Sequence, residues 1–274
     1  DIFFRHSSDD GATWDAKKNL SSNAGTSFSP QVAVSGSPGS DVYVVWYDST
    51  LGTNDIFFRH SSDDGATWDA KKNISSNADS SVSPQIAVSG SDVYVVWYDF
   101  TPGNNDIFFR HSSDDGATWD AKKNLSSNAG TSFSPQVAVS GSPGSDVYVV
   151  WQDTTPGSDD IFFRHSSDDG ATWDAKKNLS SNAGASALPQ VAVSGSDVYV
   201  VWHDSTPGNL DIFFRHSSDD GATWDAKKNL SSNAGTSFFP QIAVSGSPGS
   251  DVYVVWQDST PGSSDIFFRK GSEV

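Results

Sequence analysis

The sequence predicts an all-β fold, a five-bladed β-propeller of four-stranded antiparallel blades, and two observations lead to it. The pentad Asp-Ile-Phe-Phe-Arg recurs along the 274-residue chain at steps of 54, 51, 54, 51 and 54 residues. Each period contains four short segments with the composition of β-strands, separated by clusters of Gly, Pro, Ser and Asn. No segment has the periodicity of an amphipathic helix. Periods of this length with four strands each are typical of propeller blades.

The four predicted strands of a period become more polar in chain order. Residues 31–35 are short and small, which suits an innermost strand around a narrow axis. Residues 41–48 and 55–61 are apolar on both faces, as in strands that are covered on both sides. Residues 68–75 carry Asp and Lys, and charges of this kind on an edge strand hinder aggregation. The first strand is therefore expected at the axis and the fourth at the rim.

An octet, Ser-Ser-Asp-Asp-Gly-Ala-Thr-Trp, joins the third and fourth strands of each period. Its copies span residues 7–14, 61–68, 112–119, 166–173 and 217–224. We expect its first Asp to accept backbone N–H bonds across a hairpin turn and its Gly to adopt a positive φ. Its Trp should open the fourth strand and pack on the neighbouring sheet. The residues with these structural roles are Asp9, Gly11, Trp14, Asp63, Gly65, Trp68, Asp114, Gly116, Trp119, Asp168, Gly170, Trp173, Asp219, Gly221 and Trp224.

The pattern Ser-x-Asp-x-Gly-x-Thr-Trp resembles the Asp-box, or BNR repeat, of the sialidase-like β-propeller family. Five matches at regular spacing cover the whole chain. The resemblance implies a β-propeller in which the octets are structural turns on the face opposite the binding site. It therefore bears on the fold and not on catalysis.

We expect a single domain, residues 1–274, built from five repeats of 51–54 residues plus one surplus third strand at residues 265–270. The repeats differ in length because Ser-Pro-Gly inserts occur at residues 37–39, 142–144 and 247–249. Residues 1–20 should complete the fifth blade beside residues 239–258, because their octet hairpin is intact. The strand at 265–270 would then add to a sheet edge or exchange with another molecule, so self-association is expected there.

Composition limits the classes of function. The formal net charge of −17 disfavours nucleic acids and anionic membranes as partners. The absence of Cys excludes thiol catalysis and thiolate metal sites. No apolar run reaches the ~18 residues of a membrane span. We expect a secreted or cell-surface protein whose signal peptide does not form part of this sequence.

The resemblance invites a test for sialidase chemistry, which in that family uses an arginine triad, a Tyr activated by a Glu, and an Asp acid/base. All six Arg residues occupy the same place in the third strand, and the one Glu, Glu273, lies in the tail. A catalytic centre also needs different residues from different blades, whereas these repeats are near copies. We therefore predict no enzymatic activity. A glycoside hydrolase that uses an Asp pair stays open as an alternative.

Histidines occur in two kinds of position. Those of the third strand, one in each period, would lie far apart in a propeller, and we expect them to be structural. They are His6, His60, His111, His165 and His216. His203 is different because it breaks the repeat directly after the second-strand Trp, where the other periods have Tyr or Gln.

The repeats diverge in the loops between second and third strands and just before the inner strands. Ligands of such folds bind in loops on one face, so these residues are candidates for shallow polar and aromatic pockets. The candidates are Phe28, Tyr47, Asp48, Tyr98, Asp99, Phe133, Gln152, Asp153, His203, Asp204, Phe238, Gln257 and Asp258. Drift in solvated loops of a purely structural scaffold is the alternative interpretation.

No cofactor or metal site is predicted. Calcium remains an alternative in acidic loops such as the one between Asp48 and Asp55, although the spacing of an EF-hand is absent. Sequons such as Asn19-Leu20-Ser21 would matter only in a chain that its host glycosylates. The predicted function is a non-enzymatic binding or display module for glycans or a cell-surface partner. A sialidase-like glycoside hydrolase and a structural scaffold are the alternatives.

Overall fold

The computed structural model describes residues 1–35, 41–50, 52–100, 103–141, 146–155, 157–206, 208–245, 251–260 and 262–272. Their regular structure consists of β-strands, without a helix. None of these residues therefore forms a helix that is long and apolar enough to cross a membrane. Two compact units divide the chain, unit 1 (Asp1–Leu125) and unit 2 (Ser126–Val274). The Ser-Pro-Gly inserts and Glu273 lie outside the described residues.

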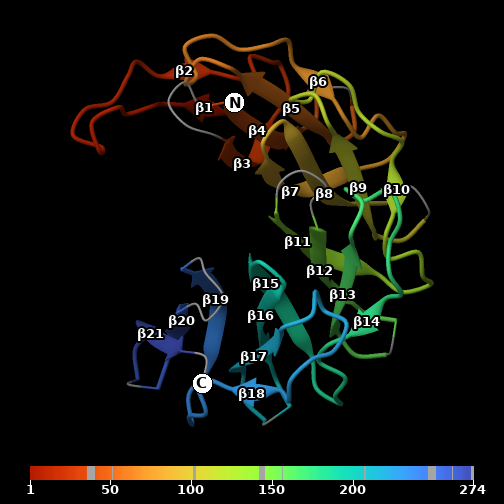
Figure 1. Ribbon diagram of the computed structural model, residues 1–274, viewed down its shortest axis with the longest axis vertical. Helices are drawn as coiled ribbons and strands as arrows, with labels where there is room; N and C mark the ends of the chain where they lie inside the picture. The colour runs from red at the N-terminus through yellow and green to blue at the C-terminus, as the bar shows by residue number, and fades with distance from the viewer. Residues whose placement is uncertain are drawn as a thin grey trace. The chain divides into compact units, whose positions relative to one another are not determined.

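Unit 1 contains two four-stranded antiparallel sheets and a two-stranded hairpin (Figure 1). The first sheet has β3 (Ser27–Ser35), β4 (Asp41–Asp48), β5 (Asp55–Ser61) and β6 (Lys72–Asn73). The second has β7 (Ser81–Ser89), β8 (Asp92–Asp99), β9 (Asp106–Ser112) and β10 (Lys123–Asn124). The hairpin pairs β1 (Phe3–Phe4) with β2 (Lys18–Asn19). In both sheets the strands follow one another in chain order, as in a meander.

Unit 2 repeats the same topology. Its first sheet has β11 (Ser132–Ser140), β12 (Asp146–Asp153), β13 (Asp160–Ser166) and β14 (Lys177–Asn178). Its second has β15 (Ser186–Ser194), β16 (Asp197–Asp204), β17 (Asp211–Ser217) and β18 (Lys228–Asn229). The last sheet is three-stranded, with β19 (Ser237–Val244), β20 (Asp251–Asp258) and β21 (Asp265–Ser272). The inner strands β11, β15 and β19 lie side by side in this order.

The second and third strands match the prediction, whereas the first and fourth differ from it. In the first repeat the inner strand begins at Ser27 rather than at residue 31, and a bulge between Phe28 and Gln31 places Ser29 at φ 48°. The outer strand is limited to Lys72–Asn73, shorter than the predicted residues 68–75. The charged residues of the fourth strand were expected on an exposed edge, but Lys122 is half-buried and lies 3.3 Å from the fully buried Asp99. That expectation is wrong, since Lys122 neutralises an interior carboxylate.

The core lies between successive sheets. Between the two sheets of unit 1, Tyr43, Val45 and Phe58 pack against the next sheet, whose Val95 and Trp97 are fully buried. Large apolar side chains on both faces of the second and third strands make this layering favourable, at ~1.5–3 kcal/mol for each fully buried side chain.

The octet is a hydrogen-bonded turn of the predicted kind. In residues 61–68, Asp63 accepts bonds from Thr67 N at 2.7 Å, from Thr67 Oγ1 at 2.7 Å and from Ser61 Oγ at 2.8 Å. Asp64 and Gly65 take the left-handed conformation at φ 56° and 82°. Gly65 suits this position because it has no Cβ to clash at positive φ.

The octet at residues 112–119 packs on the sheet that precedes it in the chain. A Cβ at Gly116 would lie 2.2 Å from the ring of Phe58, and Trp119 packs edge-on to the same ring at 5.1 Å. Lys72 donates to the carbonyl of Ala117 at 2.8 Å. The octet therefore joins two sheets, with Trp119 contacting its neighbour as the sequence predicted.

The third strand of the last sheet is not the one that the sequence favoured. The expectation that residues 1–6 hold this place is wrong, because β21 pairs with β20 from Asp258–Asp265 through Asp251–Ser272. Both strands carry the pentad Asp-Ile-Phe-Phe-Arg, so their pairing residues are the same. The local hairpin wins because closing a short loop costs less conformational entropy than a long one.

Acid should destabilise the chain through its octets. Hydrogen bonds, first of all from the following Thr, lower the pKa of Asp9, Asp63 and Asp219 from 3.8 to about 2. Since an unfolded Asp titrates near about 3.9, this contribution is complete above about pH 4 and disappears as the pH falls through about 2. The thermal midpoint should therefore fall chiefly between about pH 4 and pH 2. A midpoint that is constant across that window would contradict a stabilising role of these carboxylates.

Candidate functional site

Five of the predicted ligand-binding residues are buried Asp side chains. Asp48, Asp99, Asp153, Asp204 and Asp258, which end the second strands, are 0% exposed. These carboxylates do not reach solvent in this structure, and their contact with a ligand stays an untested prediction. Their place at the loop edge suggested exposure, but the loops before the inner strands cover them.

Asp204 shows what these carboxylates do. It accepts hydrogen bonds from Trp202 Nε1 at 3.2 Å, Thr206 N at 2.8 Å and Ser186 Oγ at 3.0 Å, and Lys227 lies 3.6 Å away. Burial raises the pKa of Asp204, but the bonds from Thr206 and Trp202 and the charge of Lys227 outweigh it and leave the pKa below its usual value. The ionised carboxylate thus bonds the loop at Thr206 and the strand β15 at Ser186, and it lies beside the positive charge of Lys227.

Calcium between Asp48 and Asp55 finds no support in the geometry. Asp48 accepts bonds from Trp46 Nε1 at 3.0 Å and Thr50 N at 3.0 Å, and Asp55 accepts one from Ser75 Oγ at 2.7 Å. These are donors to a carboxylate, and a cation would have to displace them. Calcium binding there stays an untested prediction. Leu51, in the same loop, lies outside the described residues.

The remaining candidates in unit 1 form one aromatic pair. Phe28 is 48% exposed, and its ring lies 5.5 Å from that of Tyr47, its partner across β3 and β4. Tyr98 occupies the equivalent place opposite Val82. Phe28 and Tyr47 thus offer an aromatic surface at this edge of the sheet.

Unit 2 brings more of the predicted residues together, around the beginnings of β15 and β19. His203 pairs with Ala187 across β15 and β16, and its ring lies edge-on to that of Phe238 at 6.3 Å. Phe239, which is 59% exposed, lies 6.0 Å from Phe238. A histidine and two aromatic rings from neighbouring sheets thus share one surface.

An acidic residue borders the same surface. The carbonyl of Asp159 accepts a bond from Ser186 N at 2.7 Å, and its carboxylate accepts one from Gln152 Nε2 at 2.9 Å. Asp159 therefore lies beside the start of β15, whose next residue, Ala187, pairs with His203. Gln152 was a predicted candidate, and Asp159 was missed. We call Gln152, Asp159, Leu188, His203, Phe238 and Phe239 the β15–β19 cluster.

Two members of the cluster have a strained backbone. Leu188 and Phe239 adopt φ 51° and 50° at the inner-strand bulge, where the other repeats place Ser. Bulky side chains rarely adopt a positive φ, and this costs on the order of 1–3 kcal/mol each. Such strain is often retained at functional sites. The departure from Ser was visible in the sequence, but its backbone consequence was not.

His203 has an unusual electrostatic environment. Burial lowers the pKa of His203, and the nearby Asp204 opposes this only in part. Its Nδ1 atom is buried and accepts or donates no hydrogen bond. The imidazole is therefore neutral near pH 7 and retains a basic nitrogen.

Predicted candidates Phe133 and Gln257 lie at equivalent places in the other sheets of unit 2. Phe133 pairs with Gln152 across β11 and β12, and Gln257 donates to Ser264 Oγ at 3.1 Å. They are neighbours of the β15–β19 cluster along the same edge of the sheets. Pro207, in the loop after Asp204, lies outside the described residues.

Groups that could hold a metal ion occur at the opposite end of the strands. Each has one His and two Asp residues with ligand atoms within 4.8 Å: Asp41, His60 and Asp115 in unit 1, and Asp146, His165 and Asp220 in unit 2. In the first, His60 already bonds Asp41 at 2.8 Å and Asp69 at 3.1 Å. With both ring nitrogens engaged, these histidines serve as hydrogen-bonded bridges.

The arginines are structural as well. Arg59 donates to the carbonyls of Asp69 at 2.7 Å and Leu20 at 3.2 Å, and Arg110 and Arg215 repeat this pattern. Within the described residues these guanidinium groups bind backbone and do not converge on a substrate carboxylate.

Comparison with known proteins identifies the fold. No protein-family model matches the chain, and no curated protein matches its sequence. Among solved structures the chain is similar to an α-L-arabinofuranosidase of Fusarium graminearum, with a TM-score of 0.58 and 14% identity over 88% of this chain and 79% of the other. An endo-arabinase of Bacteroides thetaiotaomicron gives a TM-score of 0.50 and 12% identity over 89% and 93%. A sialidase of Streptococcus pneumoniae gives 0.52 and 12% over 90% and 61%.

These similarities establish the fold. The chain has the all-β fold of propeller glycosidases, with repeated four-stranded antiparallel sheets as predicted. The predicted number of five blades is consistent with these sheets. At 12–15% identity, the likeness shows the fold alone.

The comparison corrects the predicted function. The prediction of a non-enzymatic binding or display module, and with it the prediction that the chain is not an enzyme, is overturned because the similar structures are glycoside hydrolases. The reasoning failed because the missing arginine triad argues against sialidase chemistry only.

Proposed function

We propose that this chain is a propeller glycoside hydrolase that acts on a neutral glycan at the β15–β19 cluster. The observation that carries the proposal is the juxtaposition at the start of β15: the carboxylate-bearing Asp159 on one side and the neutral His203 on the other, beside exposed Phe239. Aromatic rings offer flat apolar surfaces to a sugar, and a carboxylate and an imidazole are groups that can transfer protons.

The choice of a neutral substrate rests on the arginines. Recognition of a substrate carboxylate favours bidentate guanidinium groups, and the described arginines of this chain bind backbone carbonyls instead. Two of the similar structures act, by their names, on arabinose-containing glycans, which need no such triad. An arabinan-type substrate therefore fits this chain better than a sialoside.

The proposal assigns roles to four side chains of the cluster. Asp159, held by Gln152, serves as the acid/base carboxylate, and His203 supplies a neutral imidazole on the other side of the start of β15. Phe238 and Phe239 line the sugar-binding surface. We further propose that the octets are Asp-boxes in the family sense, that the repeats form one domain, and that the protein is secreted or displayed at the cell surface.

Hydrolysis should depend on Asp159. Aryl arabinofuranosides, arabinan and an aryl sialoside serve as substrates, and cleavage of the neutral compounds is expected. Asp159→Asn should lower kcat/KM about 100-fold or more, as for loss of a general acid or base. Asp174→Asn is the matched control, because its carboxylate is 64% exposed and lies by His165, on the octet side of the same sheet. Cleavage of the sialoside alone, or equal activity of both variants, would refute the proposal.

A further inference from the structure

One histidine and two aspartates meet in each unit, at the end of the strands where the octets begin. In unit 1 they are Asp41 at the start of β4, His60 in β5 and Asp115 in the octet at residues 112–119. Their ligand atoms lie within 4.8 Å of one another. The equivalent group of unit 2 consists of Asp146, His165 and Asp220. Each group therefore combines residues of one sheet with a residue of the octet that follows.

The second Asp side chain of the octet is not needed for its turn. The bond that closes the turn goes to Asp114, which accepts from Thr118 N at 2.7 Å. Asp115 takes φ 55°, a conformation that Asn or Gly adopts as well. Its carboxylate accepts a bond from the hydroxyl of Tyr43 at 2.7 Å. Asp115 thus directs a carboxylate from the octet to the preceding sheet, where His60 lies.

The imidazole of His60 meets a carboxylate at each ring nitrogen. Nδ1 lies 3.1 Å from Asp69 Oδ2, and Nε2 lies 2.8 Å from Asp41 Oδ1. A neutral imidazole has one N–H, which satisfies only one of these two acceptors. The other contact needs a second proton or a metal ion at Nε2. The ring is fixed in this orientation, because Tyr43 stacks on it at 4.9 Å.

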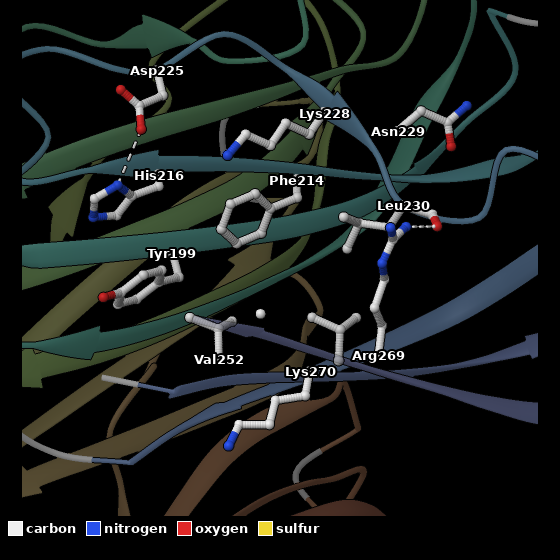
Figure 2. Close-up of a pocket in the computed structure, with 12 residues that line it drawn as sticks. Tyr199, Phe214, His216, Asp225, Lys228, Asn229, Leu230, Val252, Arg269 and Lys270 are labelled. Carbon is white, nitrogen blue, oxygen red and sulfur yellow. Dashed lines mark hydrogen bonds and ion pairs between the residues drawn. The ribbon is translucent and has the colours of Figure 1, made fainter. Parts of the chain in front are cut away.

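Figure 2 shows the same arrangement in the sheet that contains β16 and β17. Asp225 bonds Nδ1 of His216 at 3.2 Å, and Tyr199 stacks on the ring at 4.8 Å. A histidine that donates one N–H to a carboxylate directs its other nitrogen, as in the carboxylate–histidine–metal triads of zinc proteins. For His60 the orienting carboxylate is that of Asp69.

The carboxylates at Nε2 have little positive charge beside them. Within the described residues Asp41 forms an ion pair with His60, and neither Asp41 nor Asp115 forms one with a lysine or an arginine. The carboxylate of Asp48, in contrast, is paired with Lys71 at 3.6 Å. A divalent cation between Asp41, Asp115 and Nε2 would supply the missing positive charge.

We propose that each group binds one zinc ion through Nε2 of the histidine and one oxygen of each aspartate. Zinc takes nitrogen and carboxylate ligands at about 2.0–2.2 Å, so tetrahedral ligand atoms lie about 3.4 Å apart. The 2.8 Å between His60 Nε2 and Asp41 Oδ1 and the 4.8 Å limit for the whole group lie on either side of this value. The hydrogen-bonded bridge does not exclude zinc, because the ion takes the place of the proton at Nε2. Water completes the coordination.

The nitrogen ligand favours zinc over calcium, which binds six to eight oxygen atoms. Bound zinc would fasten the octet at residues 112–119 to β4 and β5, since it joins Asp115 to Asp41 and His60. A ligand that binds the folded chain stabilises it, so zinc should raise the thermal midpoint. This proposal does not depend on the proposed hydrolase activity.

The test is equilibrium dialysis of the full chain against zinc chloride, followed by metal analysis. Asp115→Asn and Asp220→Asn should each remove one zinc ion per chain, and the double variant should remove two. Asn tolerates positive φ and accepts a hydrogen bond from the tyrosine hydroxyl, so the thermal midpoint in EDTA should stay at the wild-type value. The rise of the midpoint with zinc should be smaller in the double variant.

Asp64→Asn is the matched control. Asp64 holds the same place in the octet at residues 61–68, at φ 56°, and within the described residues it belongs to no such group. The variant loses the same charge but should bind as much zinc as the wild type. Asp69→Asn tests the orientation of His60, and should weaken the zinc site of unit 1 about 10–100-fold.

Four results would overturn the proposal. One is a wild type that retains no zinc, because a proton alone would then occupy Nε2. Another is zinc binding that survives in the double variant. Equal losses in Asp64→Asn and Asp115→Asn would mean that zinc is attracted only to the acidic chain as a whole. Binding of calcium chloride without binding of zinc chloride would indicate a site made of oxygen atoms alone.

Discussion

Asp204→Ala is expected to lower the free energy of unfolding by about 3–5 kcal/mol, the cost of breaking a buried charge network. The carboxylate is 0% exposed and is the common acceptor for Trp202, Thr206 and Ser186. Its removal leaves these donors without an acceptor and Lys227 without its counter-ion. Against a total stability of about 5–15 kcal/mol, this is a large fraction. Urea denaturation followed by circular dichroism measures it.

Asp225→Ala provides the control for this change. Asp225 also bonds a neighbour, His216 at 3.2 Å, but its carboxylate is 62% exposed. Exposed pairs contribute about 0–1 kcal/mol, so the control should be close to wild type. Equal losses for the two variants would mean that burial of Asp204 does not set its importance, and would reopen its assignment to a ligand.

Local chemistry made the octet and the central strands predictable. Asp, Gly and Thr at fixed spacing define the bonds of a turn by themselves, and those bonds are present at Asp63 and Thr67. The second and third strands were recognisable because their residues are apolar on both faces. The burial of Asp204 was not predicted, because it depends on residues that are distant in the sequence. Its burial depends on Asn182 and Ser186, which precede it by a loop and a strand.

The two copies of the third strand show another limit of the sequence. Residues 1–5 and 265–269 are identical, so no pattern of pairing residues distinguishes them. The length of the connecting loop does, and it favours β21 on β20. An intact octet after residues 1–5 was a weaker argument, because the contact of an octet with the preceding sheet is separate from the pairing of the strands.

Only part of the candidate site was predicted from the sequence. His203 and Gln152 were identified because they break the repeat. The same test, applied to the last residue before each third strand and to the inner strands, would have found Asp159, Leu188 and Phe239. Their proximity could not be foreseen, since it depends on how Asp159 bonds the start of β15 in the next sheet. In a repeat protein, departures from the repeat are the strongest available signal of a site.

Trp119→Ala and Trp14→Ala should have very different effects, although both change the last residue of an identical octet. Trp119 contacts Phe58 at 5.1 Å and belongs to the core between the two sheets of unit 1. Its removal leaves a cavity against a ring that is 1% exposed, and should cost about 3 kcal/mol. Trp14 is 54% exposed, so its removal should change stability by about 0.5 kcal/mol or less.

The measurement is the urea midpoint of both variants. Trp14 is largely exposed to solvent, so its removal leaves no cavity in a core. Equal losses for the two variants would contradict this account, since identical octets would then stabilise the chain through their own turns and not through the sheets on which they pack.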